Sequence, residues 1–408
     1  MSFLADRMKE VAPSPTLAIS ALSASLRAQG KDVVGFGAGE PDFDTPDEIK
    51  EAAIEALRRG ETKYTAVSGI LPLRKAISEK LKKDHNLDYT PEEIVITNGG
   101  KQALYNFFMA VINPGDEVII PSPYWVSYRD MVVLAGGKPV FISTGVEQNF
   151  KFTAEELRSA ITKRTKAFVL NSPNNPTGIA YSREELATLA QVLEEHPHVL
   201  VVSDDIYEKL LYDGKSFYNL AMVSREIFPR TVIVNGFSKA YSMTGWRLGY
   251  AACKERQIIE AMDTIQGQST SNVTTFAQYG ALKALGCDTS FIDQMKHHFV
   301  ERRDYLLKEL SQIKGMRIAK PDGAFYIFPD ISGLLQSPGF ERLQRENPEE
   351  KDMGKLFCTH LLQDYLVAAV PGSAFGYEPA FRISYATSLD QIKKGVERLQ
   401  ECVDKLWS

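Results

Sequence analysis

The hydrophobic positions between residues 46 and 240 follow two spacings that alternate along the chain. Short continuous apolar runs, which predict buried strands with polar loops after them, lie at residues 92–100, 116–125, 138–143, 166–178, 198–208 and 231–239. Stretches with helical spacing lie between most of them, at 46–60, 101–112, 126–135, 153–161 and 183–196. This alternation predicts an α/β fold in which helices flank both faces of a mostly parallel central sheet.

The last third of the chain has a different pattern. Residues 254–310 have mainly helical spacing, and the stretch 297–313 predicts a long exposed helix. Short strand-like runs follow in AFYIFPD, YLVAAVPG and FRISYA, and the polar stretch 337–355 predicts a surface insertion. A smaller α+β domain is therefore expected beside the large one. The expected division is an N-terminal segment that completes the small domain and the site, 1–45, a large domain, 46–290, and a small C-terminal domain, 291–408.

Composition and charge narrow the possible functions. The chain has 408 residues, of which 44% are apolar and 24% charged, and its net charge of −5 does not favour binding to nucleic acid or to a membrane surface. No apolar run reaches the roughly 18 residues that a membrane-spanning helix needs, and the charged N-terminus is unlike a signal peptide. The four cysteines are too far apart for a metal pair and fit a reducing compartment. We expect a soluble, cytoplasmic protein without a metal site.

The predicted strands end in polar or aromatic groups of different types. In an open parallel sheet, ligands bind beyond the carboxyl ends of the strands. These ends carry Asn98-Gly99-Gly100-Lys101, Pro123-Tyr124-Trp125, Asn174-Asn175-Pro176-Thr177-Gly178, Asp204-Asp205-Ile206-Tyr207 and Gly236-Phe237-Ser238-Lys239. We infer a single site that is assembled from several loops.

The stretch FSKAYSMTGWRLGY places two cations, Lys239 and Arg247, close together in the sequence. An anion between them would relieve their repulsion. Gly99 and Gly100 precede a predicted helix, whose first backbone N–H groups could hold a phosphate. Ser238 could add a hydroxyl group and Arg247 a bidentate guanidinium. Nearby positive charge would lower the pKa of Lys239, as a lysine that forms a Schiff base requires.

Two further residues suggest which phosphate compound binds. Asp204 could pair with a pyridinium nitrogen, and Trp125 could stack on a flat ring. Each residue alone has an ordinary structural explanation, such as a turn, a helix cap, a core aromatic group or a surface ion pair. Together, at successive strand ends, they favour pyridoxal 5′-phosphate.

A set of motifs makes the chain similar to a known family. GEPDFDTP, GGKQAL, SPYWVSY, NSPNNPTG, SDDIYE, SKAYSMTGWRLGY and FRISYATS are typical of the fold-type I pyridoxal-phosphate aminotransferases of class I and II. Over nearly its full length the chain resembles the prokaryotic-type aspartate aminotransferases of that family. The resemblance implies a large cofactor-binding domain, a smaller domain and a homodimer.

The resemblance also implies a role for individual residues. Lys239 is the Schiff-base lysine that holds the cofactor covalently and moves a proton between Cα and C4′, and Asp204 pairs with the pyridine nitrogen. Tyr207 and Asn175 hydrogen-bond the 3-oxygen of the ring, and Trp125 stacks on it. The implied phosphate ligands are Gly100 and Lys101 through their backbone, Ser238, Arg247 and, from the neighbouring subunit, Tyr64.

Other implied roles concern the substrate. Arg382 grips the α-carboxylate, and Gly39 donates its backbone N–H to the same group. Lys101, Trp125 and Asn175 are implied on the substrate side as well. One departure is visible at residue 236, where the animal and enteric branch of the family has a hydroxyl residue and this chain has glycine, which removes one phosphate ligand. The small domain and the segment 11–40 are expected to close over bound substrate.

One lysine narrows the range of expected substrates. The animal and enteric branch binds the distal carboxylate of aspartate with an arginine from the other subunit, whereas the matching stretch 264–280 contains no arginine. Lys101 lies at the start of a predicted helix, where the helix dipole disfavours a cation unless an anion is near. The resulting hypothesis is that Lys101 binds the distal carboxylate of aspartate or glutamate. A solvent-exposed Lys101 side chain is the alternative.

We therefore expect transamination of L-aspartate with 2-oxoglutarate, giving oxaloacetate and L-glutamate. An aromatic or prephenate aminotransferase of the same branch is an alternative, because prephenate also carries two carboxylates. A non-catalytic effector-binding module ranks lower because Lys239 and Asp204 are intact. A lyase or decarboxylase on the same fold also ranks lower, because Arg382, Trp125 and Lys101 all fit transamination. The expected partners are small amino acids and 2-oxo acids.

Overall fold

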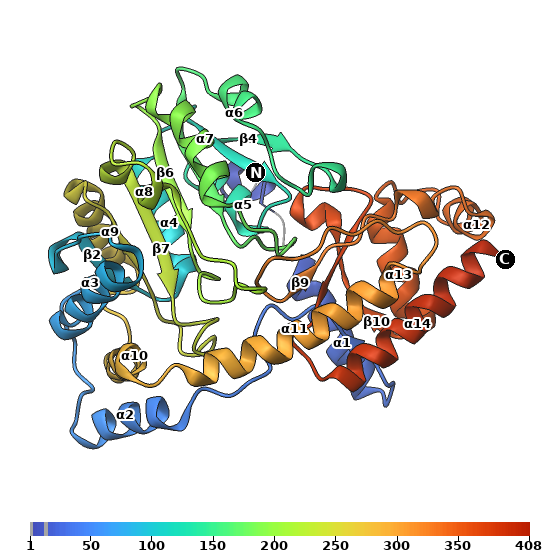
Figure 1. Cartoon of the computed structure of the whole chain (residues 1–408), viewed down its shortest axis with the longest axis horizontal. Coiled ribbons are helices and arrows are strands. Elements are labelled where there is room, and N and C mark those ends of the chain that lie inside the picture. Colours follow the sequence, from blue (N-terminus) through green and yellow to red (C-terminus); the bar gives the residue numbers. More distant parts are fainter. Residues whose placement is uncertain (1–2, 12–14) are drawn as a thin grey trace.

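A seven-stranded sheet forms the centre of the computed structural model, which describes residues 3–11 and 15–408 (Figure 1). Residues 1–2 and 12–14, part of the expected N-terminal segment, lie outside the described residues. The strands lie in the order β2 (Ile94–Thr97), β8 (Gly249–Ala252), β7 (Thr231–Gly236), β6 (Leu200–Asp204), β5 (Thr165–Asn171), β3 (Glu117–Ser122) and β4 (Lys138–Ser143). β8 is antiparallel to both neighbours, and the other pairs are parallel. The predicted mostly parallel α/β sheet is confirmed, but β8 was not among the predicted strands.

Helices cover both faces of the sheet. One face packs against α4 (Gly100–Val111), α5 (Ser127–Leu134) and α9 (Arg256–Ser269), and the other against α6 (Ala154–Ala160), α7 (Arg183–Glu194) and α8 (Leu220–Val223). Successive strand residues point to opposite faces, so Val169 and Val202 join the first core while Phe168 and Val201 join the second. Because both faces of the central strands are buried, these strands are mainly apolar, which explains their continuous runs in the sequence, whereas the edge strand β4 is largely exposed.

Three more helices pack beside the β2 edge of the sheet. They are α2 (Asp47–Arg58), α3 (Leu71–His85) and α10 (Thr275–Gly286). From there α11 (Ser290–Leu310) runs toward the C-terminal part of the chain (Figure 1).

The C-terminal part forms a smaller α+β unit together with residues from the N-terminus. Its short strands are β1 (Val34–Gly35) paired with β10 (Val367–Ala368), and β11 (Val370–Pro371), β12 (Phe381–Ser384) and β9 (Tyr326–Ile327) in one antiparallel sheet. Its helices are α1 (Pro15–Ala28), α12 (Pro338–Glu346), α13 (Met353–Tyr365) and α14 (Leu389–Trp407). The parallel pairing of β1 with β10 places the N-terminal segment beside the C-terminal strands, whereas the expected boundaries at 45 and 290 stay predictions.

Two expectations about surface segments were wrong in part. The helix expected to be exposed is α11, and it buries Arg302 and Arg303, which form ion pairs with Asp42 and Asp213. The stretch 337–355 contains α12, whose Phe340 is fully buried in the main core. Both segments are rich in charge, but each has one face against the core, and charge density alone does not reveal that face.

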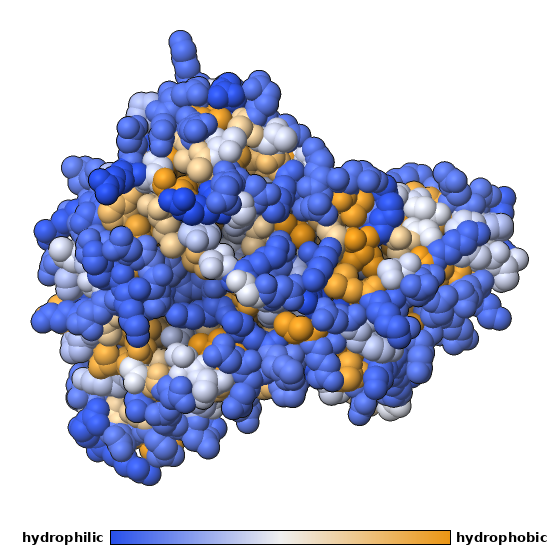
Figure 2. Space-filling view, viewed as in Figure 1, coloured by the Kyte–Doolittle hydropathy of each residue, from blue (hydrophilic) through white to orange (hydrophobic). Residues whose placement is uncertain are grey.

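The face of the molecule that is visible in Figure 2 is mostly polar. Figure 2 shows hydrophilic residues over most of the visible face, with apolar residues in smaller patches between them. Among the described residues, no helix combines the length and the apolar character needed to cross a membrane.

Candidate active site

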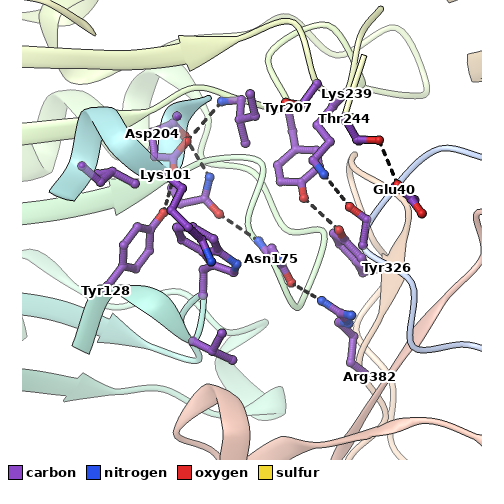
Figure 3. Close-up of a pocket in the computed structure, with 18 of the residues that line it drawn as sticks. Glu40, Lys101, Tyr128, Asn175, Asp204, Tyr207, Lys239, Thr244, Tyr326 and Arg382 are labelled. Carbon is purple, nitrogen blue, oxygen red and sulfur yellow. Dashed lines mark hydrogen bonds between the residues drawn. The ribbon is translucent and has the colours of Figure 1, made fainter. Parts of the chain in front are cut away.

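A cavity of about 430 Å³ lies at the carboxyl ends of β5, β6 and β7, beside the start of α4 (Figure 3). It brings together almost all of the residues singled out in the sequence: Gly39, Gly100, Lys101, Trp125, Asn175, Asp204, Tyr207, Ser238, Lys239, Arg247 and Arg382. Tyr64 is the exception, since it does not line this cavity and its side chain is 89% exposed. The strand ends and β12 therefore meet at one place.

Lys239 follows the end of β7, and its amine lies inside the cavity. The Nζ atom donates a hydrogen bond to the carbonyl oxygen of Gly39. Burial, assisted by the charges of Arg382 and Arg247 and opposed by the carboxylate of Glu40, lowers the pKa of Lys239 to about 8. The sequence predicts neighbouring positive charge as the cause of the lowered pKa, and the structure corrects this, because burial is the larger effect.

Asp204 is the last residue of β6, and its carboxylate is buried. The Tyr128 hydroxyl donates to Oδ2 over 2.6 Å, and the backbone N–H of Ile206 donates weakly to Oδ1 over 3.4 Å. Burial raises the pKa of Asp204 to about 6, and these hydrogen bonds and the charge of Lys239 oppose that rise. A carboxylate buried in this way is suited to a cationic N–H partner.

Asn171, at the end of β5, links two neighbouring parts of the cavity wall. Its Nδ2 donates to the backbone oxygen of Asp204 over 2.8 Å, and its Oδ1 accepts from the backbone N–H of Asn175 over 2.9 Å. The Asn175 side chain is thereby directed toward Arg382, whose Nη1 donates to Asn175 Oδ1 over 2.9 Å.

Arg382 comes from β12 and is 2% exposed. Besides its bond to Asn175, its Nη2 donates to the backbone oxygen of Gly37 over 2.8 Å. The guanidinium carbon lies 4.5 Å from the centre of the Tyr326 ring, and Nε has no hydrogen-bond partner among the described residues. A buried guanidinium with an unpaired N–H is suited to bind a carboxylate that enters the cavity.

The start of α4 forms a cradle for an anion. Gly99 precedes the helix with a φ of 79°, and a Cβ atom there would lie 2.7 Å from Nη2 of Arg247. A Cβ atom on Gly249 would lie 2.6 Å from the backbone nitrogen of Gly100. Glycine at both positions therefore lets Arg247 and the strand β8 approach the helix end. The first N–H groups of a helix have no partners within it, and they attract anions such as phosphate.

Aromatic groups form the rest of the wall. The Trp125 ring packs against the edge of Tyr128 with ring centres 5.4 Å apart, and Nζ of Lys101 lies 5.0 Å from the centre of the Trp125 ring. Lys101 is an exposed residue, yet partial desolvation of its amine and the charge of Arg247 lower its pKa. Across the cavity the hydroxyl groups of Tyr207 and Tyr326 are hydrogen-bonded at 2.8 Å.

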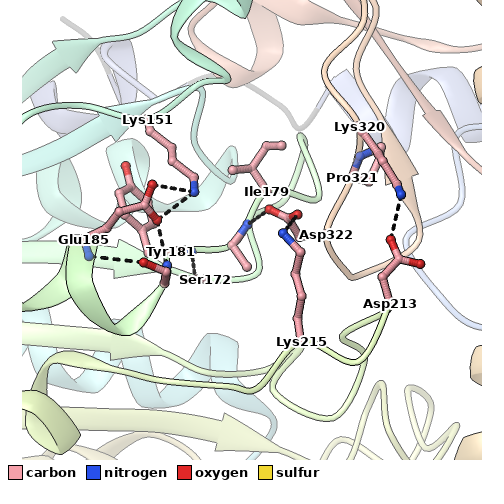
Figure 4. Close-up of polar contacts among 12 residues, drawn as sticks. Lys151, Ser172, Ile179, Tyr181, Glu185, Asp213, Lys215, Lys320, Pro321 and Asp322 are labelled. Carbon is pink, nitrogen blue, oxygen red and sulfur yellow. Dashed lines mark hydrogen bonds and ion pairs between the residues drawn. The ribbon is translucent and has the colours of Figure 1, made fainter.

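Polar contacts hold the segment that leads to Tyr326 (Figure 4). Asp322 accepts a hydrogen bond from the backbone N–H of Ala180 over 2.9 Å and forms an ion pair with Lys215. Lys320 pairs with Asp213 over 2.8 Å. These contacts fasten residues 320–322 to the loops after β5 and β6, so they place Tyr326 over the cavity.

The chain is similar to a known protein family over most of its length. The family model described as aminotransferase class I and II matches residues 31–399. The chain belongs to the class I and II aminotransferases.

Relatives of this aminotransferase match it along almost the whole chain. A probable aspartate/prephenate aminotransferase of Rhizobium leguminosarum bv. phaseoli is 50% identical over 400 residues, which cover 98% of each chain. An aspartate aminotransferase of Bacillus subtilis is 46% identical over 402 residues, which cover 98% of this chain and 99% of the relative.

Solved structures agree with the fold. The aspartate aminotransferase of Rhizobium meliloti has a TM-score of 0.92 and 44% identity, with 99% of each chain covered. The Thermus thermophilus aspartate aminotransferase, solved with maleate, has a TM-score of 0.89 and 43% identity, with 98% of this chain and 100% of that chain covered.

The aminotransferase cavity also contains residues that the sequence reasoning missed. They are Glu40, Tyr128, Asn171, Thr244 and Tyr326. Tyr128 lies three positions after Trp125, where one turn of helix could have brought the two together. Tyr326 lies in a short strand far along the chain, and no local pattern indicates that it contacts Tyr207.

Proposed function

We propose that the protein is a pyridoxal-phosphate-dependent aminotransferase that transfers the amino group of L-aspartate to 2-oxoglutarate, giving oxaloacetate and L-glutamate. The observation that carries the proposal is one cavity that holds both Lys239, whose pKa is lowered to about 8, and the buried Arg382 with its unpaired Nε. The first group suits covalent attachment of an aldehyde, and the second suits binding of an α-carboxylate. The names of relatives as aspartate aminotransferases support the substrate.

The cavity fits the cofactor because its donor groups match each part of that molecule. Lys239 would hold the cofactor covalently, Asp204 would pair with the ring nitrogen, and Trp125 would stack on the ring. Tyr207 and Asn175 would bind the 3-oxygen. The proposed phosphate ligands are the backbone groups of Gly100 and Lys101 together with Ser238 and Arg247. When bound, the cofactor supplies a ring that takes up the electron pair released when the Cα–H bond breaks.

The remaining steps use groups of this chain. Arg382 and the backbone of Gly39 bind the α-carboxylate and fix the orientation of Cα. The neutral amine of Lys239 would be the base that takes the proton from Cα and, once protonated, the acid that gives it back. Hydrolysis by a water molecule, which supplies the keto oxygen, would release oxaloacetate and leave the amino group in the active site. 2-Oxoglutarate would then take up the amino group by the reverse path, which predicts ping-pong kinetics.

Lys101 is the proposed ligand of the distal carboxylate. Its amine lies over the Trp125 ring in the cavity wall, and a carboxylate there would pair with it. The second candidate substrate is prephenate, because several relatives are named aspartate/prephenate aminotransferases. Both substrates carry two carboxylates, so Arg382 and Lys101 serve either one.

We also propose a homodimer in which Tyr64 reaches the phosphate site of the partner. Tyr64 is 89% exposed, and apolar side chains nearby in the sequence, Ile54, Leu57 and Leu71, are exposed as well. A second copy of the chain would cover them. A cytoplasmic location remains part of the proposal, since all four cysteines are free thiols, as is usual in a reducing compartment.

Reductive trapping tests whether pyridoxal phosphate binds covalently to Lys239. The protein is incubated with pyridoxal phosphate, reduced with borohydride and digested, and mass spectrometry locates the modified lysine. We expect the label on Lys239 and its loss in Lys239→Ala, with no loss in the surface control Lys163→Ala. A label on another lysine, or none, would overturn the proposal.

The substrate assignment is tested by stopped-flow half-reactions. The loss of the absorption band of the lysine-bound cofactor is followed with aspartate, glutamate, phenylalanine and arogenate. Fast loss with the acidic donors and slow loss with phenylalanine and arogenate supports aspartate, whereas fast loss with arogenate moves the protein to the prephenate function. Lys101→Ala should slow the reaction with aspartate more than that with phenylalanine, and equal effects would remove Lys101 from the proposal.

Subunit mixing tests the dimer. Tyr64→Ala and Lys239→Ala subunits are each expected to have low activity, and a mixed dimer of the two restores one complete site. A mixture of wild type with the double variant gives no such gain and serves as control. Absence of recovery in mixed dimers would exclude a role for Tyr64 across the interface.

A further inference from the structure

The Tyr128 hydroxyl is the closest hydrogen-bond donor to the Asp204 carboxylate. Tyr128 lies in the first turn of α5, is 2% exposed, and donates to Oδ2 of Asp204 over 2.6 Å. The loop before it carries Trp125, whose ring packs against the Tyr128 ring. One short segment thus supplies both the aromatic wall of the cavity and a partner of the buried carboxylate (Figure 3).

Burial disfavours the negative charge of Asp204, and neighbouring groups stabilise that charge. Burial raises the pKa of this carboxyl group, and three features oppose that rise: first the hydrogen bond from Tyr128, then the backbone N–H of Ile206, then the charge of Lys239. The phenol itself stays protonated, because burial and the adjacent Asp204 carboxylate raise the pKa of Tyr128 well above its usual value. Tyr128 therefore remains a hydrogen-bond donor near neutral pH.

The geometry leaves room for one more donor. A carboxylate has about four lone-pair positions, of which Tyr128 occupies one on Oδ2 and Ile206 occupies one on Oδ1 at the long distance of 3.4 Å. Asp204 lines the cavity, so a cationic N–H inside the cavity can approach the remaining positions. A carboxylic acid in place of the carboxylate would leave that N–H without its negative partner.

We propose that Tyr128 is a positioning residue for the reaction, whose hydroxyl holds Asp204 in the orientation and the anionic form that pair with the protonated ring nitrogen of the cofactor. The inference rests on the proposed function. Tyr128 does not touch the reacting atoms and acts through Asp204.

Tyr128→Phe tests the proposal, because it removes one oxygen atom and keeps the ring that packs on Trp125. Without this donor, the proton shared by Asp204 and the ring nitrogen moves toward Asp204. In holoenzyme prepared with cofactor labelled with ¹⁵N in the ring, the nitrogen signal should shift toward that of the unprotonated ring. The turnover number with aspartate should fall about 10- to 100-fold, the loss that corresponds to one hydrogen bond to a charged group. KM should change little, because Arg382 is untouched.

Tyr250→Phe is the matched control. Tyr250 lies on β8, is also 2% exposed, and its hydroxyl has no partner among the described residues. Its removal takes the same atom from the core without reaching Asp204. Tyr250→Phe should keep the wild-type nitrogen signal and turnover number, and circular dichroism checks that both variants are folded.

A double-variant cycle separates a positioning role from a general loss of stability. In an Asp204→Asn background the added Tyr128→Phe substitution should have almost no effect, because the group through which Tyr128 acts is gone. An undiminished effect in that background would overturn the proposal. A Tyr128→Phe enzyme with the nitrogen signal and turnover number of Tyr250→Phe would overturn it as well. If the wild type fails to trap cofactor on Lys239, the proposed function itself fails, which is a different result.

Discussion

The Lys239 amine should be far more nucleophilic near neutral pH than an ordinary lysine amine. Burial, assisted by Arg382 and Arg247, lowers its pKa from 10.5 to about 8. An amine attacks an electrophilic carbon in its neutral form. At pH 7 roughly one tenth of Lys239 amines are neutral, against about three in ten thousand ordinary lysine amines, so the neutral fraction is about 300-fold larger.

Trace labelling measures this advantage directly. Cofactor-free protein is exposed to a limiting amount of acetic anhydride at a series of pH values from 6 to 10, and mass spectrometry quantifies acetylation of each lysine. Complete acetylation after denaturation provides the reference for each peptide. The rate for Lys239 should rise tenfold for each pH unit below about 8 and level off above it, because the neutral fraction then saturates.

Two variants test how much the nearby charge of Glu40, as distinct from burial, contributes to the pKa of Lys239. Glu40 opposes the lowering of the Lys239 pKa, so Glu40→Gln should move the midpoint to lower pH. Thr244→Val breaks the hydrogen bond of 2.8 Å between Thr244 and Glu40 but keeps the carboxylate, and it should move the midpoint less. A wild-type midpoint near 10.5 would refute the burial argument. Equal midpoints in Glu40→Gln and wild type would refute the role of charge.

Three further substitutions test the packing around the cavity. Arg382→Met should lower kcat/KM for aspartate about 100-fold or more while cofactor trapping on Lys239 persists, because a buried carboxylate would lose its charged partner. Gly249→Ala would place a Cβ atom 2.6 Å from the Gly100 nitrogen, so cofactor affinity measured by fluorescence titration should fall about tenfold. Arg302→Met leaves Asp42 without its bidentate partner, and urea unfolding should show a loss of about 2 kcal/mol; an unchanged midpoint would contradict this.

Much of the fold is readable from local patterns. Apolar runs and helical spacing are properties of neighbouring residues, so the alternation of strands and helices and the α/β class follow from the sequence. Thr153 illustrates this at the level of one residue, since its hydroxyl accepts the N–H of Glu156, three residues along the chain, and caps α6. Because parallel strands end at the same edge of a sheet, the order of motifs also predicted which residues share one site.

Other features depend on contacts between distant segments. The run Gly249–Ala252 is as apolar as the neighbouring strands, and nothing within the run indicates that it pairs antiparallel with both β7 and β2. Arg302 has the sequence context of an exposed helix, yet an ion pair with Asp42, 260 residues away, lets it be buried. Local sequence contains no information on such a partner.

The chemistry of the site divides in the same way. The sequence by itself determined the residue types, since lysine, aspartate and arginine at strand ends define which reactions are open to the chain. Only the tertiary structure decided the pKa of each group, because the desolvation of Lys239 and Asp204 depends on the segments that cover them. Tyr128 and Tyr326 became part of the site for the same reason: their hydroxyl groups find Asp204 and Tyr207 only when distant parts of the chain pack together.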